Sequence, residues 1–335
     1  MLLLDAEAVR AVYPMTTAIP VMAEAMRKFS GGLVTQPLRT ILRPEADPAV
    51  FASMPCHVGG DGDAGYGLKA IMLKLDNAAK GLPVHVGVVV VFDADTGAPA
   101  AVIDCAELTA IRTAAVSAVA TDALARPDAG DLAVLGAGVQ ARSHLQAMDA
   151  VRDLRRVRVW NRTAARARKL RDWAATWLDV PVEVVDSVPD ALAGADLVCT
   201  TTSTKDPVVP GEALAGGAHV NAVGASLRDA RELHSDAVAR CAVFVDSRES
   251  AAAESGDLLV PLEEGLTGDG HVRAELGEVL LGRHPGRTGR DEITLYKSLG
   301  LAAQDIASGF AVARLAADAG VGTVVPMGAE RLVAP

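Results

Sequence analysis

The spacing of apolar positions changes along the chain and predicts two regions of different architecture. Residues 5–30 carry apolar side chains near helical spacing, for example Val9, Val12 and Ile19, and Gly31-Gly32 is a typical helix end. Short apolar runs bounded by turn residues predict strands at 40–42, 67–75, 84–92 and 100–104. Because strand follows strand, we expect an antiparallel or mixed sheet there, followed by one long helix over 107–125.

From residue 131 onward, strands and helices alternate. Apolar runs predict strands at 132–135, 156–160, 182–185, 197–200, 219–223 and 242–246. Helical or polar segments lie between them, including predicted helices over 139–152 and 163–178. This alternation is typical of a parallel sheet covered on both faces. The fold class is therefore α/β, with a doubly wound parallel sheet over 119–299. An α+β region over 1–118 precedes it, and an Ala-rich helix near 300–318 is expected to pack back on that region within a segment 300–335.

Composition excludes several functions. The 335 residues carry a net charge of −10, which disfavours general nucleic-acid binding, and half of them are hydrophobic, which excludes wholesale disorder. The densest apolar run, 86–92, is far shorter than the roughly 20 residues of a membrane span. We expect no secretory signal at the N-terminus. The four cysteines are far apart and form no C-x-x-C, which indicates reduced thiols and a cytoplasmic protein.

A glycine motif follows the first strand of the alternating region. Gly136, Gly138 and Ala141 form G-x-G-x-x-A between a predicted strand and a predicted helix, with another strand about 20 residues on. Gly136 permits the tight turn, Gly138 lets backbone N–H groups approach a pyrophosphate, and Ala141 allows close packing of helix on strand. This context predicts a Rossmann dinucleotide site rather than a plain tight turn.

The end of the second strand bears on the cofactor. NAD sites usually place an acid there, on the ribose 2′-hydroxyl. This chain has Asn161-Arg162-Thr163 instead, and a guanidinium suits a 2′-phosphate. We therefore expect NADP(H) rather than NAD(H), the alternative being that Arg162 is a solvated surface charge.

Ordered motifs along nearly the whole chain resemble the ornithine cyclodeaminase/mu-crystallin family. They are Gln36–Thr40, Gly67–Lys69, Leu108–Ala115, Gly136–Gln140, Asn221–Gly224, Glu254–Asp257, Glu275–Glu278 and Lys297–Gly300. The family includes ornithine and lysine cyclodeaminases, a type of alanine dehydrogenase, and ketimine reductases. The resemblance implies a homodimer in which the α+β region, 1–118 with 300–335, binds substrate and dimerises.

The resemblance also implies the site. The carboxylate of a small α-amino or α-imino acid would be bound by Arg39, Lys69 and Arg112, and His85 would line the substrate pocket. The alternatives are a surface role for Arg39, an edge-strand lysine, a structurally ion-paired Arg112 and an ordinary core or edge histidine. The implied cofactor-binding residues are Thr113, Gly136, Ala137, Gly138, Val139, Gln140, Asn161, Arg162, Thr163, Thr200, Thr201, Thr202, Val223, Ser226, Lys297, Ser298 and Leu299.

One departure from the family pattern favours reductase chemistry. Cyclodeaminases have an Asp two residues after the glycine of the Asn221–Gly224 motif, whereas this chain has Ser226. A serine cannot act as a carboxylate base near neutral pH, and Asp229 would substitute with a different geometry. Ketimine reductases resembling mu-crystallin share the serine, so the resemblance is nearest to that branch.

Three functions remain open at this point. The first is an NADPH-dependent imine reductase acting on a small cyclic or acyclic α-imino acid, with Lys69 or a water held by Ser226 as the catalytic proton source. The second is a cyclodeaminase or amino-acid dehydrogenase, and the third is a nucleotide-dependent ligand-binding protein without turnover. The sequence contains no His pattern typical of a metal site and no Gly-x-Ser-x-Gly elbow, so neither metal-dependent nor hydrolase chemistry is expected.

Overall fold

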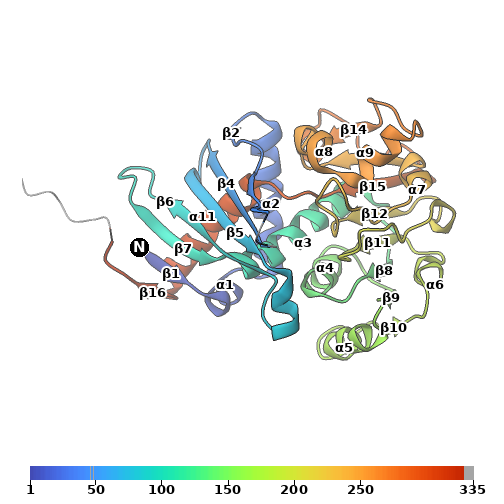
Figure 1. The fold of residues 1–335 in the computed structure, drawn as a ribbon, viewed down its shortest axis with the longest axis horizontal. Helices are drawn as coiled ribbons and strands as arrows, with labels where there is room; N and C mark the ends of the chain where they lie inside the picture. The colour runs from blue at the N-terminus through green and yellow to red at the C-terminus, as the bar shows by residue number, and fades with distance from the viewer. Residues whose placement is uncertain (46, 48, 328–335) are drawn as a thin grey trace, which may run out of the picture. The chain divides into compact units, whose positions relative to one another are not determined.

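The computed structural model describes residues 1–45, 47 and 49–327, in which the chain forms two compact units. Unit 1 consists of Met1–Arg112 and the chain from Leu301 onward, and unit 2 consists of Thr113–Gly300. The boundary expected at residue 118 falls inside helix α3 (Cys105–Leu124), which contains both Arg112 and Thr113. Figure 1 shows the elements of each unit.

Unit 1 is an α+β unit. Its strands are β1 (Leu2–Leu4), β2 (Val34–Thr35), β3 (Thr40–Leu42), β4 (Val50–Val58), β5 (Gly65–Leu73), β6 (His85–Phe92), β7 (Pro99–Asp104) and β16 (Thr323–Val324). Its helices are α1 (Ala6–Val12), α2 (Met15–Ser30), the short η1 (Leu75–Lys80), the start of α3, and α11 (Ala302–Ala319). The helix expected over 5–30 is divided at Pro14, which lies in extended conformation directly before α2.

The strands of unit 1 form one mixed sheet in the order β16-β1-β7-β6-β5-β4-β2, with β3 also paired to β4. Every pairing is antiparallel except that of β1 with β7. The mixed sheet was expected, but β4 was not, because its residues alternate weakly in polarity and include Pro55 and His57. Because β4 was not predicted, no strand that could pair with β3 was predicted either.

The two faces of this sheet differ in what covers them. Helix α11 packs against β4, β5 and β6 on one face, where Gly67 is required because a Cβ there would lie 2.5 Å from Ile306. Lys69, opposite Val89 on β6, lies on this covered face. The side chains at the alternate positions of these strands lie on the other face. Exposed apolar side chains on it are Leu42, Tyr66, Met72, Val86 and Val88.

Unit 2 alternates strand and helix, as expected. Its strands are β8 (Asp131–Leu135), β9 (Arg156–Trp160), β10 (Val182–Val184), β11 (Leu197–Thr200), β12 (His219–Ala222), β13 (Cys241–Val245), β14 (Val272–Glu275) and β15 (Ile293–Lys297). Its helices after α3 are α4 (Val139–Asp149), α5 (Ala164–Ala174), α6 (Val188–Leu192), η2 (Gly211–Ala213), α7 (Ser235–Ala239), α8 (Arg248–Glu254), α9 (Gly256–Glu263) and α10 (Leu276–Leu280).

The eight strands of unit 2 are all parallel and lie in the order β10-β9-β8-β11-β12-β15-β13-β14. The chain runs outward from β8 through β9 to β10, and then returns to the other side of β8 with β11. This reversal places a topological switch point between β8 and β11, where α/β sheets bind ligands at the carboxyl ends of their strands. The strands β14 and β15 were not predicted, because charged or polar residues interrupt both runs.

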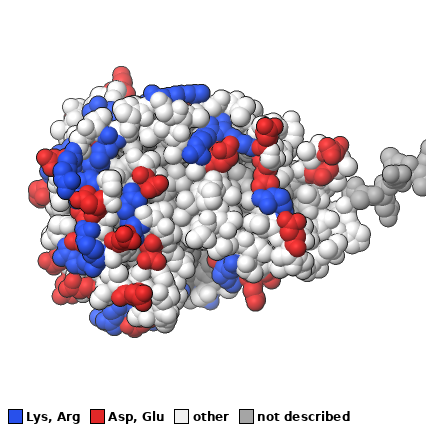
Figure 2. Space-filling model, turned by 180° about the vertical axis from the view of Figure 1, so that it is seen from behind, with Lys and Arg blue, Asp and Glu red and all other residues white. Residues whose placement is uncertain are grey.

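The surface and the thiols bear on the expected function class. On the face shown in Figure 2, basic and acidic side chains are interspersed rather than gathered by sign. All four cysteines are unpaired and buried, and burial raises the pKa of Cys56, Cys199 and Cys241 to about 12. Of the helices in the described ranges, none combines the length and apolarity that crossing a membrane requires.

Candidate functional site

The glycine motif forms the turn between β8 and α4 in unit 2. Gly136 has φ +115°, and a Cβ there would lie 2.7 Å from the carbonyl oxygen of Thr201, so glycine is required. Gly138 precedes the first turn of α4 in extended conformation without a side-chain cap, and a Cβ on it would meet nothing within 4 Å. The helix therefore begins without a side-chain cap, and there is open space beside Gly138. This geometry fits a pyrophosphate group.

Residues flanking this turn belong to the same edge of the sheet. Thr201 donates its N–H and its hydroxyl to the carbonyl of Leu135, which joins the ends of β8 and β11 at the switch point. The side-chain oxygen of Gln140 is buried without a hydrogen-bond partner among the described residues. Ala137 is half-buried and Val139 is exposed. An orphaned acceptor beside an open helix end is typical of a ligand site.

The end of β9 presents the side chains that were expected to distinguish the two cofactors. Arg162 and Thr163 are exposed, and the half-buried Asn161 donates its amide N–H to the carbonyl of Thr163 at 3.0 Å. The strand end itself carries no carboxylate, as the sequence shows.

A buried glutamate joins the loops that follow β11 and β12. Glu232 accepts the hydroxyl of Thr200 at 2.6 Å, the N–H and hydroxyl of Thr202 at 2.7 Å, and the N–H of Gly224 at 2.6 Å. Burial raises the pKa of Glu232, although Lys297 and the threonines oppose this effect. Sequence reasoning missed this residue. The only local signal was an acid three residues before the start of helix α7 at Ser235, and such a signal is weak by itself.

Lys297 lies under the same loops. Its ammonium is fully buried, 2.8 Å from Asp257, and also donates to the carbonyl of Ala225. Asp257 in turn accepts the N–H groups of Glu232 and Leu233. Lys297 is therefore bound to other residues of the chain, and these contacts fix the loop that begins at Val223. Direct contact of Lys297 with a cofactor stays a prediction.

A second buried acid, Asp246, holds the segment after β15. Its carboxylate accepts the N–H groups of Leu299 and Gly300, each at 2.7 Å. Ser298 is buried beside them, and Thr113 is buried at the start of unit 2. The sequence motif at 297–300 is thus positioned by an aspartate that sequence reasoning did not single out.

Ser226 and Asp229 lie on the loop after β12. Ser226 is half-buried, whereas Asp229 is exposed and its carboxylate lies 3.6 Å from the exposed ammonium of Lys205. An exposed, ion-paired carboxylate is poorly placed to act as the base that Ser226 cannot provide.

In unit 1, Lys69 and Arg112 converge on one carboxylate. The Lys69 ammonium on β5 and the Arg112 Nε on α3 each lie 2.9 Å from the same oxygen, Oδ1 of Asp305 on α11. All three side chains are buried. Burial by itself would raise the pKa of Asp305, but the Arg112 guanidinium and the Lys69 ammonium hold it below its usual value. Sequence reasoning missed Asp305 as the partner of both cations.

Further hydrogen bonds orient the two cations. Lys69 also donates to the hydroxyl of Thr109 at 2.9 Å, and Arg112 donates through Nη1 to the amide oxygen of Gln304 at 2.7 Å. Two buried cations thus meet one buried carboxylate, which leaves a net charge of +1. Because an uncompensated buried charge is costly, this cluster is suited to receive an anion.

The other two predicted substrate residues are placed as follows. His85 begins β6 opposite Leu73, on the same face of the sheet as Lys69. It is exposed, yet desolvation of its ring and the Lys69 ammonium lower its pKa. Arg39 is half-buried directly before β3. Their contact with a substrate stays a prediction.

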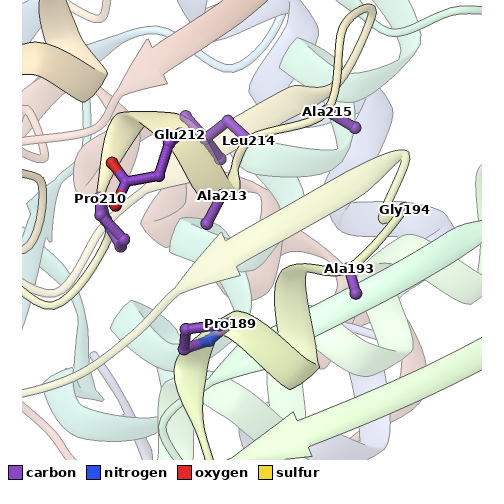
Figure 3. Close-up of a pocket in the computed structure, with 8 residues that line it drawn as sticks. All are labelled: Pro189, Ala193, Gly194, Pro210, Glu212, Ala213, Leu214 and Ala215. Atoms are coloured by element: carbon purple, nitrogen blue, oxygen red, sulfur yellow. The ribbon is translucent and has the colours of Figure 1, made fainter.

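A surface hollow in unit 2 is not a candidate active site. It is lined by Pro189, Ala193, Gly194, Pro210, Glu212, Ala213, Leu214 and Ala215, and Figure 3 shows a single acid among apolar side chains. Gly194 and Ala215 precede β11 and β12, so the hollow lies at the amino ends of these strands. Ligands of α/β sheets bind at the opposite ends.

Comparison with known proteins agrees with the description of both units given above. The profile of the ornithine cyclodeaminase/mu-crystallin family matches residues 1–318. A Delta(1)-pyrroline-2-carboxylate reductase of Bacillus cereus is 36% identical over 323 residues, which are 96% of this chain and 98% of the relative. The ketimine reductase mu-crystallin of Mus musculus is 38% identical over 291 residues, 86% and 88% of the two chains.

A solved structure is also similar over the whole chain. The Delta(1)-pyrroline-2-carboxylate reductase of Thermococcus litoralis, in complex with NADH and L-proline, has a TM-score of 0.93 and 35% identity. The match covers 97% of this chain and 100% of the other. These relatives are oxidoreductases that reduce imines.

Proposed function

The chain belongs to the ornithine cyclodeaminase/mu-crystallin family, and from this premise we propose that it is an NADPH-dependent reductase of a small α-imino acid, cyclic or acyclic. The observation that carries the proposal is the buried cluster of Lys69, Arg112 and Asp305, whose excess positive charge suits one substrate carboxylate. The relatives named above act on substrates of this class.

The residues of unit 1 would bind and polarise the substrate. Arg112 keeps guanidinium N–H groups that form no hydrogen bond with any described residue, and a planar fork suits a carboxylate. Lys69 binds beside it, with Arg39 as the third cation. The Lys69 ammonium, or a water held by the Ser226 hydroxyl, supplies the proton to the imine nitrogen.

The residues of unit 2 would hold the cofactor, which supplies the hydride for the C=N carbon. The open N-terminus of α4 and Gly138 receive the pyrophosphate. Asn161, Arg162 and Thr163 at the end of β9 receive the ribose phosphate, because an exposed guanidinium suits a 2′-phosphate and no acid is present to bind the free hydroxyl. This is the basis for NADPH rather than NADH.

The protein would act as a homodimer. The uncovered face of the sheet in unit 1 exposes Leu42, Tyr66, Met72, Val86 and Val88 on adjacent strands. A contiguous apolar face of this kind is typical of a surface covered by a partner. Val86→Glu together with Met72→Glu should convert a dimer to a monomer in sedimentation equilibrium, whereas a wild-type monomer would contradict the assignment.

The function is tested by NADPH oxidation with a panel of imino acids. The panel contains pyrroline-2-carboxylate, piperideine-2-carboxylate, and pyruvate with ammonia or methylamine, and turnover is expected with at least one. A parallel assay follows ammonia release from L-ornithine with catalytic NAD, which should be slow or absent because Ser226 replaces the acid of cyclodeaminases. Fast ammonia release would overturn the reductase assignment in favour of cyclodeamination, and binding without turnover would favour a ligand-binding role.

A further inference from the structure

The carboxylate of Asp305 in unit 1 forms ion pairs with two cations that come from different elements of secondary structure. Lys69 comes from β5 and Arg112 from α3, and the Oδ1 atom of Asp305 lies 2.9 Å from both. Asp305 itself lies in the first turn of α11, where the helix dipole favours a negative charge, and its side chain is fully buried. The relative position of the two cations is therefore set by one atom.

Lys69 and Arg112 have N–H donors that their hydrogen bonds within the protein do not use. Of the three N–H groups of Lys69, Thr109 and Asp305 take two. Of the five of Arg112, Asp305 takes one at Nε and Gln304 takes one at Nη1. The remaining four N–H groups form no hydrogen bond within the part of the chain that the structure describes. A carboxylate that fixes two cations through part of their donors also fixes the direction of the others.

The carboxylate is not arranged for maximal stability. Its second oxygen, Oδ2, is buried and has no hydrogen-bond partner among the described residues. A buried acceptor left without a donor destabilises the folded state, so such an atom calls for an explanation. The placement of both cations on Oδ1 provides one, because it fixes the Lys69 ammonium and the Arg112 guanidinium next to each other.

The other titratable groups near the cluster add no second anion. They are Cys56 on β4, Cys105 on α3 and His85 on β6. Burial raises the pKa of both thiols, which keeps them neutral, and the pKa of His85 is lowered. Asp305 is the carboxylate that forms ion pairs with both Lys69 and Arg112.

We propose that Asp305 is the positioning residue of the substrate site, holding the Lys69 ammonium and the Arg112 guanidinium side by side so that both address one substrate carboxylate. This inference rests on the proposed function, because it assumes that the two cations bind the substrate. Asp305 acts through them and does not itself touch the reacting atoms.

Asp305→Asn is the direct test. It preserves shape but removes the charge, so the two cations repel each other and lose their common anchor. We expect the KM for the imino acid and the Kd for L-proline to rise at least tenfold, while the Kd for NADPH is unchanged. The alkaline limb of kcat/KM should move to lower pH, because the Lys69 ammonium then faces the guanidinium alone. An unchanged or lowered KM with an unmoved alkaline limb would overturn the proposal.

Two further variants distinguish the effect of where the Asp305 carboxylate lies from the effects of its charge and of helix packing. Asp305→Glu keeps the charge but displaces it by one methylene, so the KM should rise while the alkaline limb stays in place. Ser308→Ala, on the same helix, removes a buried hydrogen bond of 3.0 Å with Tyr13 and serves as the packing control. It should lower the thermal midpoint with KM unchanged. If Asp305→Asn does not fold, an unchanged KM in Asp305→Glu overturns the proposal on its own.

The same measurements distinguish failure of this inference from failure of the proposed function. If the wild-type protein neither reduces an imino acid nor binds L-proline, the proposed function fails and the inference falls with it. If the wild-type protein does both, and Arg112→Ala abolishes them while the Asp305 variants keep normal KM, the function stands and Asp305 is merely structural.

Discussion

The two units bury charge in opposite ways. In unit 1, Lys69 and Arg112 share Asp305, and the cluster keeps a net positive charge and unused donors. In unit 2, Lys297 meets Asp257, whose other oxygen accepts two backbone N–H groups. The first cluster is incomplete without an anion, whereas the second is complete, because the charges of Lys297 and Asp257 cancel. Burial of a charge therefore does not by itself identify a binding residue; the net charge of its cluster does.

The largest expected effect lies in the incomplete cluster. Arg112→Ala or Lys69→Ala should lower kcat/KM for an imino acid by about 200- to 5,000-fold, because losing one partner of a desolvated ion pair costs about 3–5 kcal/mol. The Kd for NADPH should be unchanged. Arg10→Ala, which removes an exposed ion pair with Glu107 in the same unit, is the matched control and should keep normal activity. Near-normal turnover in either cluster variant would show that its cation does not bind substrate.

Substitution in the complete cluster, Lys297 with Asp257, should lower the stability of the fold. Lys297→Met leaves Asp257 without its cation in a fully buried position, so the free energy of unfolding should fall by about 3–5 kcal/mol. Urea denaturation measures this change. Lys205→Met removes the exposed pair with Asp229 and should change the same quantity by about 0–1 kcal/mol. If the two substitutions cost equally little, Lys297 is not a structural element of the loop after β12.

Acid should weaken unit 2 through two buried histidines. Burial lowers the pKa of His144 to about 4 and of His219 to about 3, so both stay neutral in the folded state at pH 5. In the unfolded chain they take up protons below about pH 6.5. Stability is therefore fully present above that pH and is lost as the pH falls, by about 2 kcal/mol for each histidine at pH 5. In unit 1, His57 and His85 are at least partly exposed.

Urea denaturation at pH 8 and pH 5 tests this asymmetry. His144→Asn and His219→Asn should each reduce the difference in unfolding free energy between the two pH values by about 2 kcal/mol. Comparing each variant with itself at two pH values cancels the change in packing. A difference as large in both variants as in the parent would show that other groups govern acid stability.

The sequence predicted the parts whose signal is local. Strands of the parallel sheet appear as apolar runs, and the turn at Gly136 carries its own glycine signature, so both could be read directly. The strand β4 could not, because its alternation is weak and Pro55 interrupts it. The mixed order of the sheet in unit 1, with β1 beside β7, depends on pairings between distant residues and leaves no local signal.

The site was predicted unevenly for the same reason. The resemblance to the family pointed to Lys69 and Arg112, and the apolar surroundings of Arg112 in the sequence show that its charge needs a partner, but that partner, Asp305, lies 193 residues from Arg112 in sequence. Asp305, Glu232 and Asp246 act through contacts that only the fold creates. A sequence can therefore show that a buried charge needs compensation without showing which residue provides it.

The smallest expected effect concerns an exposed cation of unit 2, Arg162. Unlike Lys297 it is exposed at the end of β9, so its expected partner is the 2′-phosphate of NADPH. Arg162→Ala should narrow the gap between the NADPH and NADH dissociation constants by about tenfold, since one charge-assisted contact contributes about 1.5–3 kcal/mol. Because the contact is exposed, the gap in the parent should also narrow as salt rises. Arg171→Ala, on the exposed side of α5 beside Asp172, is the control and should leave the gap intact. Equal affinity of the parent for both cofactors would contradict the assignment, and would show that the end of β9 tolerates NADH without an acid.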